Sequence, residues 1–179
     1  MLRRSVECIL AGIGLLILLP ILVSVAIVIT LLERSSPFFL QERLGLHQRS
    51  FTIYKFRTML DGEITMLGRI LRKSGIDEIP QLINILRGDM SFVGPRPLLA
   101  SDIVRLEWTG DYYAKRWSVR PGITGLAQLG SKCHKKFTWV HDKYYVDHTS
   151  FCLDLKILYL SLGVPLLGKA RVKKLIHNQ

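Results

Sequence analysis

The sequence predicts an α+β fold that is mostly helical, built from an N-terminal membrane helix and one compact domain. The chain has 179 residues, which suits a single domain of ordinary size. Hydrophobic residues make up 49% of it, and its formal net charge is +11. The apolar content argues against disorder, and the positive charge indicates a membrane surface or a partner that carries phosphates. Composition alone leaves lipid, nucleotide and nucleic acid open.

An uncharged stretch near the N-terminus predicts the membrane helix. From Cys8 to Leu32 the chain has 25 residues, and none is charged. As a helix rising about 1.5 Å per residue it would be about 37 Å long, enough to cross a hydrocarbon layer of about 30 Å. Arg3 and Arg4 precede it as in a signal peptide, but the stretch is too long for one and no small-x-small cleavage site closes it. We therefore expect residues 1–34 to form a retained membrane anchor.

Pro20 lies at the centre of this stretch and predicts a bend. Its ring removes one backbone N–H and displaces the carbonyl of Leu16. Each arm would be about 18 Å long, near half the hydrocarbon thickness, so a re-entrant helix could enter and leave on one side. Cations flank both ends, so the positive-inside rule does not assign the ends to opposite sides. A kinked span and a re-entrant helix both fit the residues.

Residues 35–179 are expected to form the compact domain on the membrane surface. Phe51 to Met59 alternates as a strand does, which places Lys55 and Arg57 on one face. Two cations on one face could grip a phosphate. A solvated edge strand is the alternative interpretation.

Helices are expected on both sides of a loop-rich centre. One should run from about Leu67 to Lys73, and another from Ser74 to Arg87, with Gly88 ending it. Near the C-terminus, Phe151 to Leu167 is apolar but interrupted by charged residues, glycine and proline, so it is a poor second span. It suits either an interfacial amphipathic helix or a helix in the domain core. The tryptophans could lie at the head-group level or in the core; they are Trp108, Trp117 and Trp139.

Glycine and proline punctuate the centre of the chain and predict ordered loops. One loop is Gly94-Pro95-Arg96-Pro97, and the other contains Arg120-Pro121-Gly122. Pro121 and Gly122 suit the central positions of a type II turn. Prolines on both sides restrict the backbone of Arg96. A guanidinium on a stiff loop loses less freedom when it binds a phosphate, although turns with solvated arginines are the simpler interpretation.

Cysteines and histidines give no strong metal signal. The chain has three cysteines and no C-x-x-C pair, which argues against a zinc ribbon or a disulfide framework. His134, His141 and His148 recur every seven residues, so on a helix successive rings would start about 10 Å apart. That distance is too long for one tetrahedral site.

Adjacent acids at Asp77 and Glu78 are the best candidates for chemistry. As a structural feature, Ser74-x-x-Asp77 matches a capping box, and acids are common in first helical turns. As a chemical feature, a carboxylate near cations stays ionised, as a nucleophile must. Its neighbour could hold a divalent metal that shields a diphosphate.

Four motifs, found in order along the chain, favour the chemical interpretation of Asp77 and Glu78. They are Lys55-Phe56-Arg57-Thr58-Met59, Asp77-Glu78-Ile79-Pro80-Gln81-Leu82, Gly88-Asp89-Met90-Ser91-Phe92-Val93-Gly94-Pro95-Arg96-Pro97 and Arg120-Pro121-Gly122-Ile123-Thr124-Gly125. Together they resemble the bacterial sugar transferases, the monotopic phosphoglycosyl transferases. Tyr144-Tyr145-Val146 and Leu153-Asp154-Leu155-Lys156 continue the likeness, so it covers nearly the whole chain.

The resemblance implies an enzyme of the bacterial cytoplasmic membrane whose catalytic domain, residues 35–179, faces the cytoplasm. Such enzymes transfer a sugar 1-phosphate from a UDP-sugar to polyprenol phosphate and release UMP, the first membrane step of glycoconjugate or exopolysaccharide biosynthesis. By analogy Asp77 attacks the β-phosphorus to form a covalent aspartyl phosphosugar, and polyprenol phosphate then attacks that intermediate. The likeness also favours the re-entrant form of the helix bent at Pro20.

The resemblance assigns roles to further residues. Glu78 would help to bind Mg²⁺, and the substrate phosphates would contact cations. These cations are Lys55, Arg57, Arg72, Arg96 and Arg120. The expected partners are a UDP-sugar, polyprenol phosphate and membrane lipids, with no nucleic acid. Two rival interpretations are a Mg²⁺-dependent phosphohydrolase with an aspartyl nucleophile and a basic membrane adaptor without activity.

Three features depart from the family pattern. Leu19 stands before Pro20 where the family commonly has serine, and the nearest hydroxyl is that of Ser24. The segment Leu60 to Met66 is shorter than the corresponding family loop. Gly130-Ser131-Lys132-Cys133 stands where Gly-Arg-Asn is expected, so the preference for sugar or nucleotide is expected to differ.

Overall fold

The fold is mostly helical with small sheets, as the sequence predicts. The computed structural model describes residues 2–129 and 135–167. By packing, the chain forms two compact units. The first comprises Met1–Glu42 and Thr52–Gly88, and the second comprises Arg43–Phe51 and Asp89–Gln179. The division at residue 34 between anchor and catalytic domain stays a prediction.

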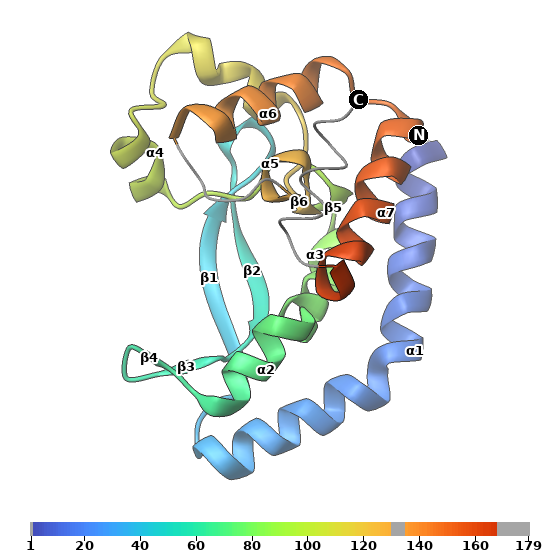
Figure 1. Cartoon of the computed structure of the whole chain (residues 1–179), viewed down its shortest axis with the longest axis vertical. Coiled ribbons are helices and arrows are strands. Elements are labelled where there is room, and N and C mark those ends of the chain that lie inside the picture. The colour runs from blue at the N-terminus through green and yellow to red at the C-terminus, as the bar shows by residue number, and fades with distance from the viewer. Residues whose placement is uncertain (1, 130–134, 168–179) are drawn as a thin grey trace. The chain divides into compact units, whose positions relative to one another are not determined.

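Helix α1 (Leu2–Glu33) contains the whole uncharged stretch. It continues through Pro20 and bends about midway along its length (Figure 1), as predicted. The Ser24 hydroxyl donates a hydrogen bond of 2.8 Å to the Pro20 carbonyl oxygen. Such a bond from residue i to the carbonyl of residue i−4 often accompanies a bend.

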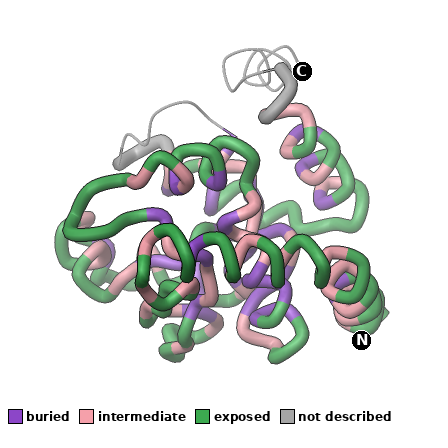
Figure 2. Tube along the Cα trace, turned by 90° about the horizontal axis from the view of Figure 1, so that it is seen from below, coloured by how far each residue is buried: buried purple, intermediate pink, exposed green. Residues whose placement is uncertain are grey.

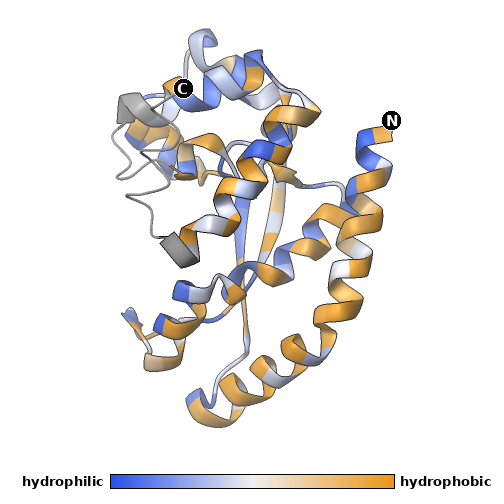
Figure 3. Cartoon of the chain, turned by 45° about the vertical axis from the view of Figure 1, so that its right-hand side comes forward, coloured by the Kyte–Doolittle hydropathy of each residue, from blue (hydrophilic) through white to orange (hydrophobic). Residues whose placement is uncertain are grey.

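Most side chains of α1 are apolar, as the hydropathy colours in Figure 3 show. Many of its leucines, isoleucines and valines are exposed, and Figure 2 shows little burial along the helix that starts at the N-terminus. Within the described residues, α1 is the one helix long and apolar enough to cross a membrane. The bend is confirmed, and the re-entrant path stays a prediction.

Both arms of α1 pack on the rest of the first unit. The N-terminal arm lies on α3 (Leu82–Arg87): Ala11 is fully buried, and the Arg4 guanidinium donates to the carbonyl oxygen of Ile85. The C-terminal arm buries Ile29 in a cluster with Phe56 and Leu71. The helix is therefore an integral part of this unit.

Strands β1 (Phe38–Leu44) and β2 (Ser50–Phe56) form a hairpin around the short helix η1 (Leu46–Gln48). The predicted strand from Phe51 to Met59 is therefore interrupted after Phe56. A second hairpin pairs β3 (Met59–Leu60) with β4 (Glu63–Ile64). Its turn residues Asp61 and Gly62 have φ values of 50° and 86°, which suit a tight two-residue turn.

Helix α2 (Met66–Ser74) agrees closely with the prediction. The hydroxyl of Thr65 caps it by accepting a hydrogen bond of 2.9 Å from the Gly68 N–H. Gly75, with φ of 75°, ends the helix in the left-handed region.

The next helix differs from the prediction. A 3₁₀ helix, η2 (Ile76–Gln81), comes first, and α3 follows it and ends at Gly88, whose φ is 92°. The Ser74 capping box is wrong, because Ser74 closes α2 and its hydroxyl donates to the carbonyl oxygens of Ile70 and Leu71.

The second unit is built around a parallel pair of short strands. Strand β5 (Ser91–Val93) pairs with β6 (Gly122–Thr124). Gly122 pairs with Ser91 within the sheet and has no positive φ, so the predicted type II turn is wrong. A side chain at Gly122 would overlap the Gly94 backbone, so close approach of the two loops is what requires glycine there.

Among the described residues, four α-helices and a further 3₁₀ helix belong to the second unit, and α7 packs on both strands. They are α4 (Ala100–Leu106), α5 (Leu126–Leu129), α6 (Lys135–Asp147) and α7 (Phe151–Leu167), together with the 3₁₀ helix η3 (Asp111–Ser118). One face of α7 buries Ile157 and Leu160 against Val93 and Tyr145, which confirms the core interpretation for that face. The opposite face exposes Phe151, Leu155, Tyr159 and Leu162.

The three tryptophans lie in a core cluster of the second unit, with 4%, 6% and 5% of Trp108, Trp117 and Trp139 exposed. They pack with Leu98 and Tyr113, and the Tyr113 ring stacks on Trp108 and makes an edge contact with Trp139. The core interpretation of the tryptophans is therefore confirmed. These side chains are buried mainly against one another and against neighbouring aromatic and aliphatic residues.

Replacing Gly68 by alanine should destabilise the protein. Alanine usually favours a helix, but a Cβ at Gly68 would overlap the carbonyl group of Thr58. Such overpacking against backbone costs about 1 to 3 kcal/mol. Thermal unfolding in detergent measures the loss.

Gly12→Ala is the matched control, because Gly12 is also helical and a Cβ at that position would have nothing within 4 Å. Its stability should be unchanged or slightly raised. A Gly68→Ala protein as stable as the parent would contradict this account of the α2 contact.

Candidate functional site

Asp77 and Glu78 lie in the first turn of η2, directly after the left-handed Gly75. Asp77 is buried, with 9% of its surface exposed. Glu78 is more open, and its Oε1 accepts a hydrogen bond of 2.6 Å from the Nζ of Lys55. Lys55 comes from β2, so the strand and the 3₁₀ helix are joined at the carboxylate pair.

Arg72 approaches the same place from the last turn of α2. Its Nε donates a hydrogen bond of 2.8 Å to the hydroxyl of Thr58, which is 6% exposed. The positive charge of Arg72 acts on Asp77 and lowers its pKa. The terminal nitrogens of Arg72 make no hydrogen bond within the described residues, so they are available to an anion.

Burial raises the pKa of Asp77 above its ordinary value, and the negative charge of Glu78 raises it further. Lys55 and Arg72 lower the pKa but do not cancel these effects. The sequence prediction that this carboxylate stays ionised remains a prediction. Desolvation is the largest cause of the raised pKa, and it depends on packing against other elements.

The carboxylate pair fits one way of holding a metal. Within the described residues no group of three histidine, cysteine, aspartate or glutamate side chains could form a full protein cage. Mg²⁺ commonly binds through one or two carboxylates together with substrate phosphates. Asp77 and Glu78 fit that mode, since the second carboxylate oxygen of Glu78 has no hydrogen bond in the described part of the chain.

Arg57 does not join this group. Its Nε donates a hydrogen bond of 2.8 Å to the carbonyl oxygen of Ser36, and one terminal nitrogen lies 3.4 Å from that of Phe38. Its backbone N–H also bonds the carbonyl of Pro37. In this structure Arg57 fixes the chain between α1 and β1, and its role as a phosphate ligand stays a prediction.

Arg96 and Arg120 belong to the second unit, where the two predicted loops meet. The N–H of Gly94 bonds the Thr124 carbonyl at 2.9 Å, and the N–H of Gly122 bonds the Pro95 carbonyl at 3.0 Å. Arg96 is exposed, and its side chain makes no hydrogen bond or ion pair within the described residues. The ordered loop is confirmed, and phosphate binding by its exposed Arg96 stays a prediction.

Three further buried polar residues lie in the first unit and were not predicted individually: Thr58, Gln81 and Asn84. Asn84 is fully buried; its Oδ1 accepts a hydrogen bond of 3.1 Å from the Tyr54 N–H and its Nδ2 donates one of 2.7 Å to the Thr52 carbonyl. Thr58 bonds Arg72. Gln81 is 2% exposed and its Nε2 has no hydrogen-bond partner in the described residues. Thr58 and Gln81 lie within the motifs quoted above, which was the available signal, whereas Asn84 lies outside all four motifs.

Other predicted features fall elsewhere. Among the described histidines, the ring of His148 contacts the Tyr144 carbonyl at 2.9 Å, and none belongs to a group able to hold a metal. His134 and the segment at 130–133 lie outside the described residues. The short segment from Leu60 to Met66 forms the β3–β4 hairpin and the start of α2.

A family model described as "Bacterial sugar transferase" matches residues 1–168. The chain is 43% identical to the "Uncharacterized sugar transferase EpsL" of Bacillus subtilis, over 89% of this chain and 85% of that protein. It is 34% identical to the "UDP-N-acetylgalactosamine-undecaprenyl-phosphate N-acetylgalactosaminephosphotransferase" of Aeromonas hydrophila, over 93% of this chain and 44% of that protein.

A third relative is the "UDP-glucose:undecaprenyl-phosphate glucose-1-phosphate transferase" of Escherichia coli. It is 31% identical over 95% of this chain and 41% of its own length. The chain therefore spans less than half of these two named transferases and most of EpsL.

Asp77→Asn should stabilise the protein at neutral pH in the absence of metal. A carboxyl whose folded pKa is raised destabilises the fold above that pKa, and the penalty disappears as the pH falls toward the unfolded value. Removing the charge should therefore raise the free energy of unfolding at neutral pH, and the gain should shrink as the pH falls. Thermal unfolding in detergent with a chelator, measured across pH, tests this.

Asp61→Asn is the matched control, because Asp61 is exposed in the β3–β4 turn and asparagine tolerates its positive φ. Its stability should not change. If Asp77→Asn destabilises the fold at neutral pH, then Asp77 is a structural residue and the account of its burial is wrong.

Proposed function

This chain belongs to the bacterial sugar transferase family, and from that premise we propose that it is a phosphoglycosyl transferase. It would transfer a sugar 1-phosphate from a UDP-sugar to polyprenol phosphate and release UMP. The names of the relatives from Aeromonas hydrophila and Escherichia coli support this, since both name undecaprenyl phosphate as the acceptor. Those relatives differ in sugar, so the sugar of this chain stays open.

One observation carries the proposal: Asp77 is held in the same packed unit as the long apolar helix. Ile76, its neighbour, packs on the cluster formed by Ile29, Phe56 and Leu71. A soluble sugar nucleotide and a lipid with its phosphate in the head-group plane can meet only at the membrane surface. A nucleophile fixed next to a membrane helix would lie where both substrates can reach it.

The reaction would proceed by two displacements at one phosphorus atom. First, a carboxylate oxygen of Asp77 bonds the β-phosphorus of the UDP-sugar, and the bond from that phosphorus to the bridging oxygen breaks, so UMP leaves with the electron pair. Next, a phosphate oxygen of polyprenol phosphate bonds the same phosphorus. The Asp77–phosphorus bond then breaks, which regenerates the carboxylate and gives polyprenyl diphosphate sugar. Two steps keep the two anionic substrates from having to react together.

The surrounding residues have separate tasks in this scheme. Arg72 would bind phosphate through its terminal nitrogens, and Lys55 would hold Glu78 and then contact the diphosphate. Arg96, Arg120 and Arg57 are the remaining phosphate-binding candidates. Glu78 would hold Mg²⁺ together with diphosphate oxygens. When bound, Mg²⁺ would neutralise part of the negative charge that develops during transfer.

The membrane topology is also part of the proposal. A re-entrant α1 would bring both of its ends to the cytoplasmic side, where UDP-sugars are made. The bend at Pro20, its support by Ser24 and the cations at both ends favour this path. The catalytic part of the chain would then lie on the cytoplasmic face of the bacterial inner membrane.

Asp77→Asn should abolish transfer while leaving membrane association intact. The amide cannot attack phosphorus, so turnover should fall by more than about a thousandfold. The assay incubates purified protein with Mg²⁺, polyprenol phosphate and a panel of UDP-sugars that includes UDP-glucose and UDP-N-acetylgalactosamine, and measures UMP release and lipid-linked sugar. Asp61→Asn, which changes an exposed acid of the same unit, should retain full activity.

Two other results would redirect the assignment. Release of sugar phosphate without polyprenol phosphate would identify a phosphohydrolase that uses water as acceptor. Turnover that survives Asp77→Asn would point to a different mechanism. If no donor is turned over and the protein binds acidic surfaces in a salt-sensitive way, it would be a membrane adaptor.

Cysteines placed at both ends of α1 should react from the same side of the membrane. In a variant without the native cysteines, Leu2→Cys and Ser36→Cys are labelled with an impermeant maleimide in vesicles of both orientations; both positions are exposed. Labelling of both only from the cytoplasmic side is expected. Labelling of Leu2→Cys from the opposite side alone would mean that α1 spans the membrane.

A further inference from the structure

A buried ion pair lies beneath the loop that carries Arg96. Arg116 of η3 and Asp142 of α6 are each 2% exposed, and the Arg116 Nε donates a hydrogen bond of 2.8 Å to the Asp142 Oδ2. The guanidinium carbon lies 5.6 Å from the ring centre of Trp108 and 5.0 Å from that of Trp117. These contacts leave the Arg116 side chain with one orientation.

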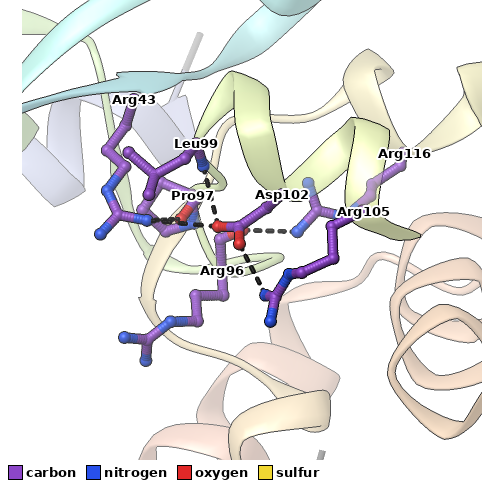
Figure 4. Close-up of polar contacts among 7 residues, drawn as sticks. All are labelled: Arg43, Arg96, Pro97, Leu99, Asp102, Arg105 and Arg116. Carbon is purple, nitrogen blue, oxygen red and sulfur yellow. Dashed lines mark hydrogen bonds and ion pairs between the residues drawn. The ribbon is translucent and has the colours of Figure 1, made fainter. Parts of the chain in front are cut away.

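In that orientation Arg116 reaches the Arg96 loop. Its Nη2 donates a hydrogen bond to the carbonyl oxygen of Arg96 (Figure 4). The planar guanidinium thus links two fixed partners: the Asp142 carboxylate through Nε and the Arg96 backbone through Nη2. A lysine has one nitrogen and cannot reproduce both bonds in this geometry.

The following carbonyl is held in a similar way from the other side. The Nη1 of Arg43 lies 3.4 Å from the Pro97 carbonyl oxygen and 3.8 Å from the Asp102 Oδ2. Asp102 in turn accepts a bond of 3.2 Å from the Leu99 N–H and lies 2.7 Å from Arg105 (Figure 4). Two consecutive loop carbonyls therefore each face an arginine that has its own carboxylate.

The backbone of Arg96 is held by these contacts, but its side chain is not. Its own side chain has no hydrogen bond or ion pair within the described residues, and in Figure 4 it extends away from Asp102. Prolines on both sides restrict its backbone. A guanidinium left unpaired on a fixed backbone is pre-organised for an anion, because little conformational freedom is lost on binding.

We propose that Arg116, anchored by Asp142, is a positioning residue that fixes the backbone of Arg96 for binding a substrate phosphate. This rests on the proposed function, in which Arg96 is a phosphate ligand. A purely structural role explains the pair less well, since apolar side chains often stabilise a core as well as a buried ion pair does. The hydrogen bond to the Arg96 carbonyl is what such side chains could not supply.

The test is a double-mutant cycle between the two arginines in the full-length protein. Arg116→Lys keeps the charge beside Asp142 but should lose the bond to the loop, so it should weaken UDP binding about tenfold. With the donor that the chain turns over, KM should rise by a similar factor while kcat changes little. Arg96→Ala should weaken UDP binding at least as much. Since Arg116 acts through Arg96, the double variant should bind UDP no more weakly than Arg96→Ala alone.

Controls separate this role from general stability. Arg105→Lys alters the same charge network at a position 75% exposed and should leave UDP affinity and KM unchanged. If Arg116→Lys does not fold, Asp142→Asn replaces it in the double-mutant cycle with Arg96→Ala. This variant removes the carboxylate that orients Arg116, and UDP affinity is measured in the same way.

The outcomes distinguish the two proposals. Additive losses in the cycle, or normal UDP affinity in Arg116→Lys, would overturn the positioning role and leave the transferase assignment untouched. Normal UDP affinity in Arg96→Ala would overturn both the positioning role and the phosphate role of Arg96. The transferase assignment itself depends on Asp77→Asn.

Discussion

The burial of Asp77 beside another carboxylate is the constraint on which the first unit depends. A carboxyl with 9% exposure next to Glu78 is destabilising unless nearby cations oppose it. Lys55 and Arg72 supply those cations from a strand and a helix that are distant in sequence from each other. Their positions must therefore be fixed by packing, because neither could be placed by local backbone preference alone.

Asn84 shows how that fixing is achieved. Its amide bonds the backbone of β2 at Thr52 and Tyr54, and α3 carries it directly after the helix that holds Asp77. Lys55 directly follows Tyr54 in β2, so the buried Asn84 amide fixes the position of Lys55 relative to Glu78. On the other side, Thr58 holds Arg72 by its Nε and leaves the outer nitrogens for a ligand. The site is thus supported by neutral polar groups, which add no charge to a crowded place.

Local signals in the sequence predicted the elements that local chemistry controls. The bend at Pro20, the extent of α2 and the end of α3 at Gly88 depend on a ring or a left-handed residue within one turn. Ser74 and Gly122 were misassigned because distant partners decide their conformation: Ser74 completes α2, and Gly122 enters a parallel strand pair. The two acids and the candidate phosphate-binding cations were predicted through motif resemblance. The raised pKa of Asp77 follows from tertiary burial, which no motif encodes.

Each unit contains an arginine proposed to bind phosphate, and in each unit another residue holds that arginine in place. Arg72 and Arg96 are proposed to bind a substrate phosphate through nitrogens that have no partner in the described residues. A long side chain on a mobile backbone would bind it weakly, because ordering that side chain costs entropy. In the first unit Thr58 holds Arg72 at one nitrogen. In the second, Arg116 holds the Arg96 backbone while Asp142 neutralises Arg116. In both places the support comes from a residue that does not neutralise the proposed phosphate-binding arginine: a neutral hydroxyl at Thr58, and at Arg116 a guanidinium that is itself neutralised by Asp142.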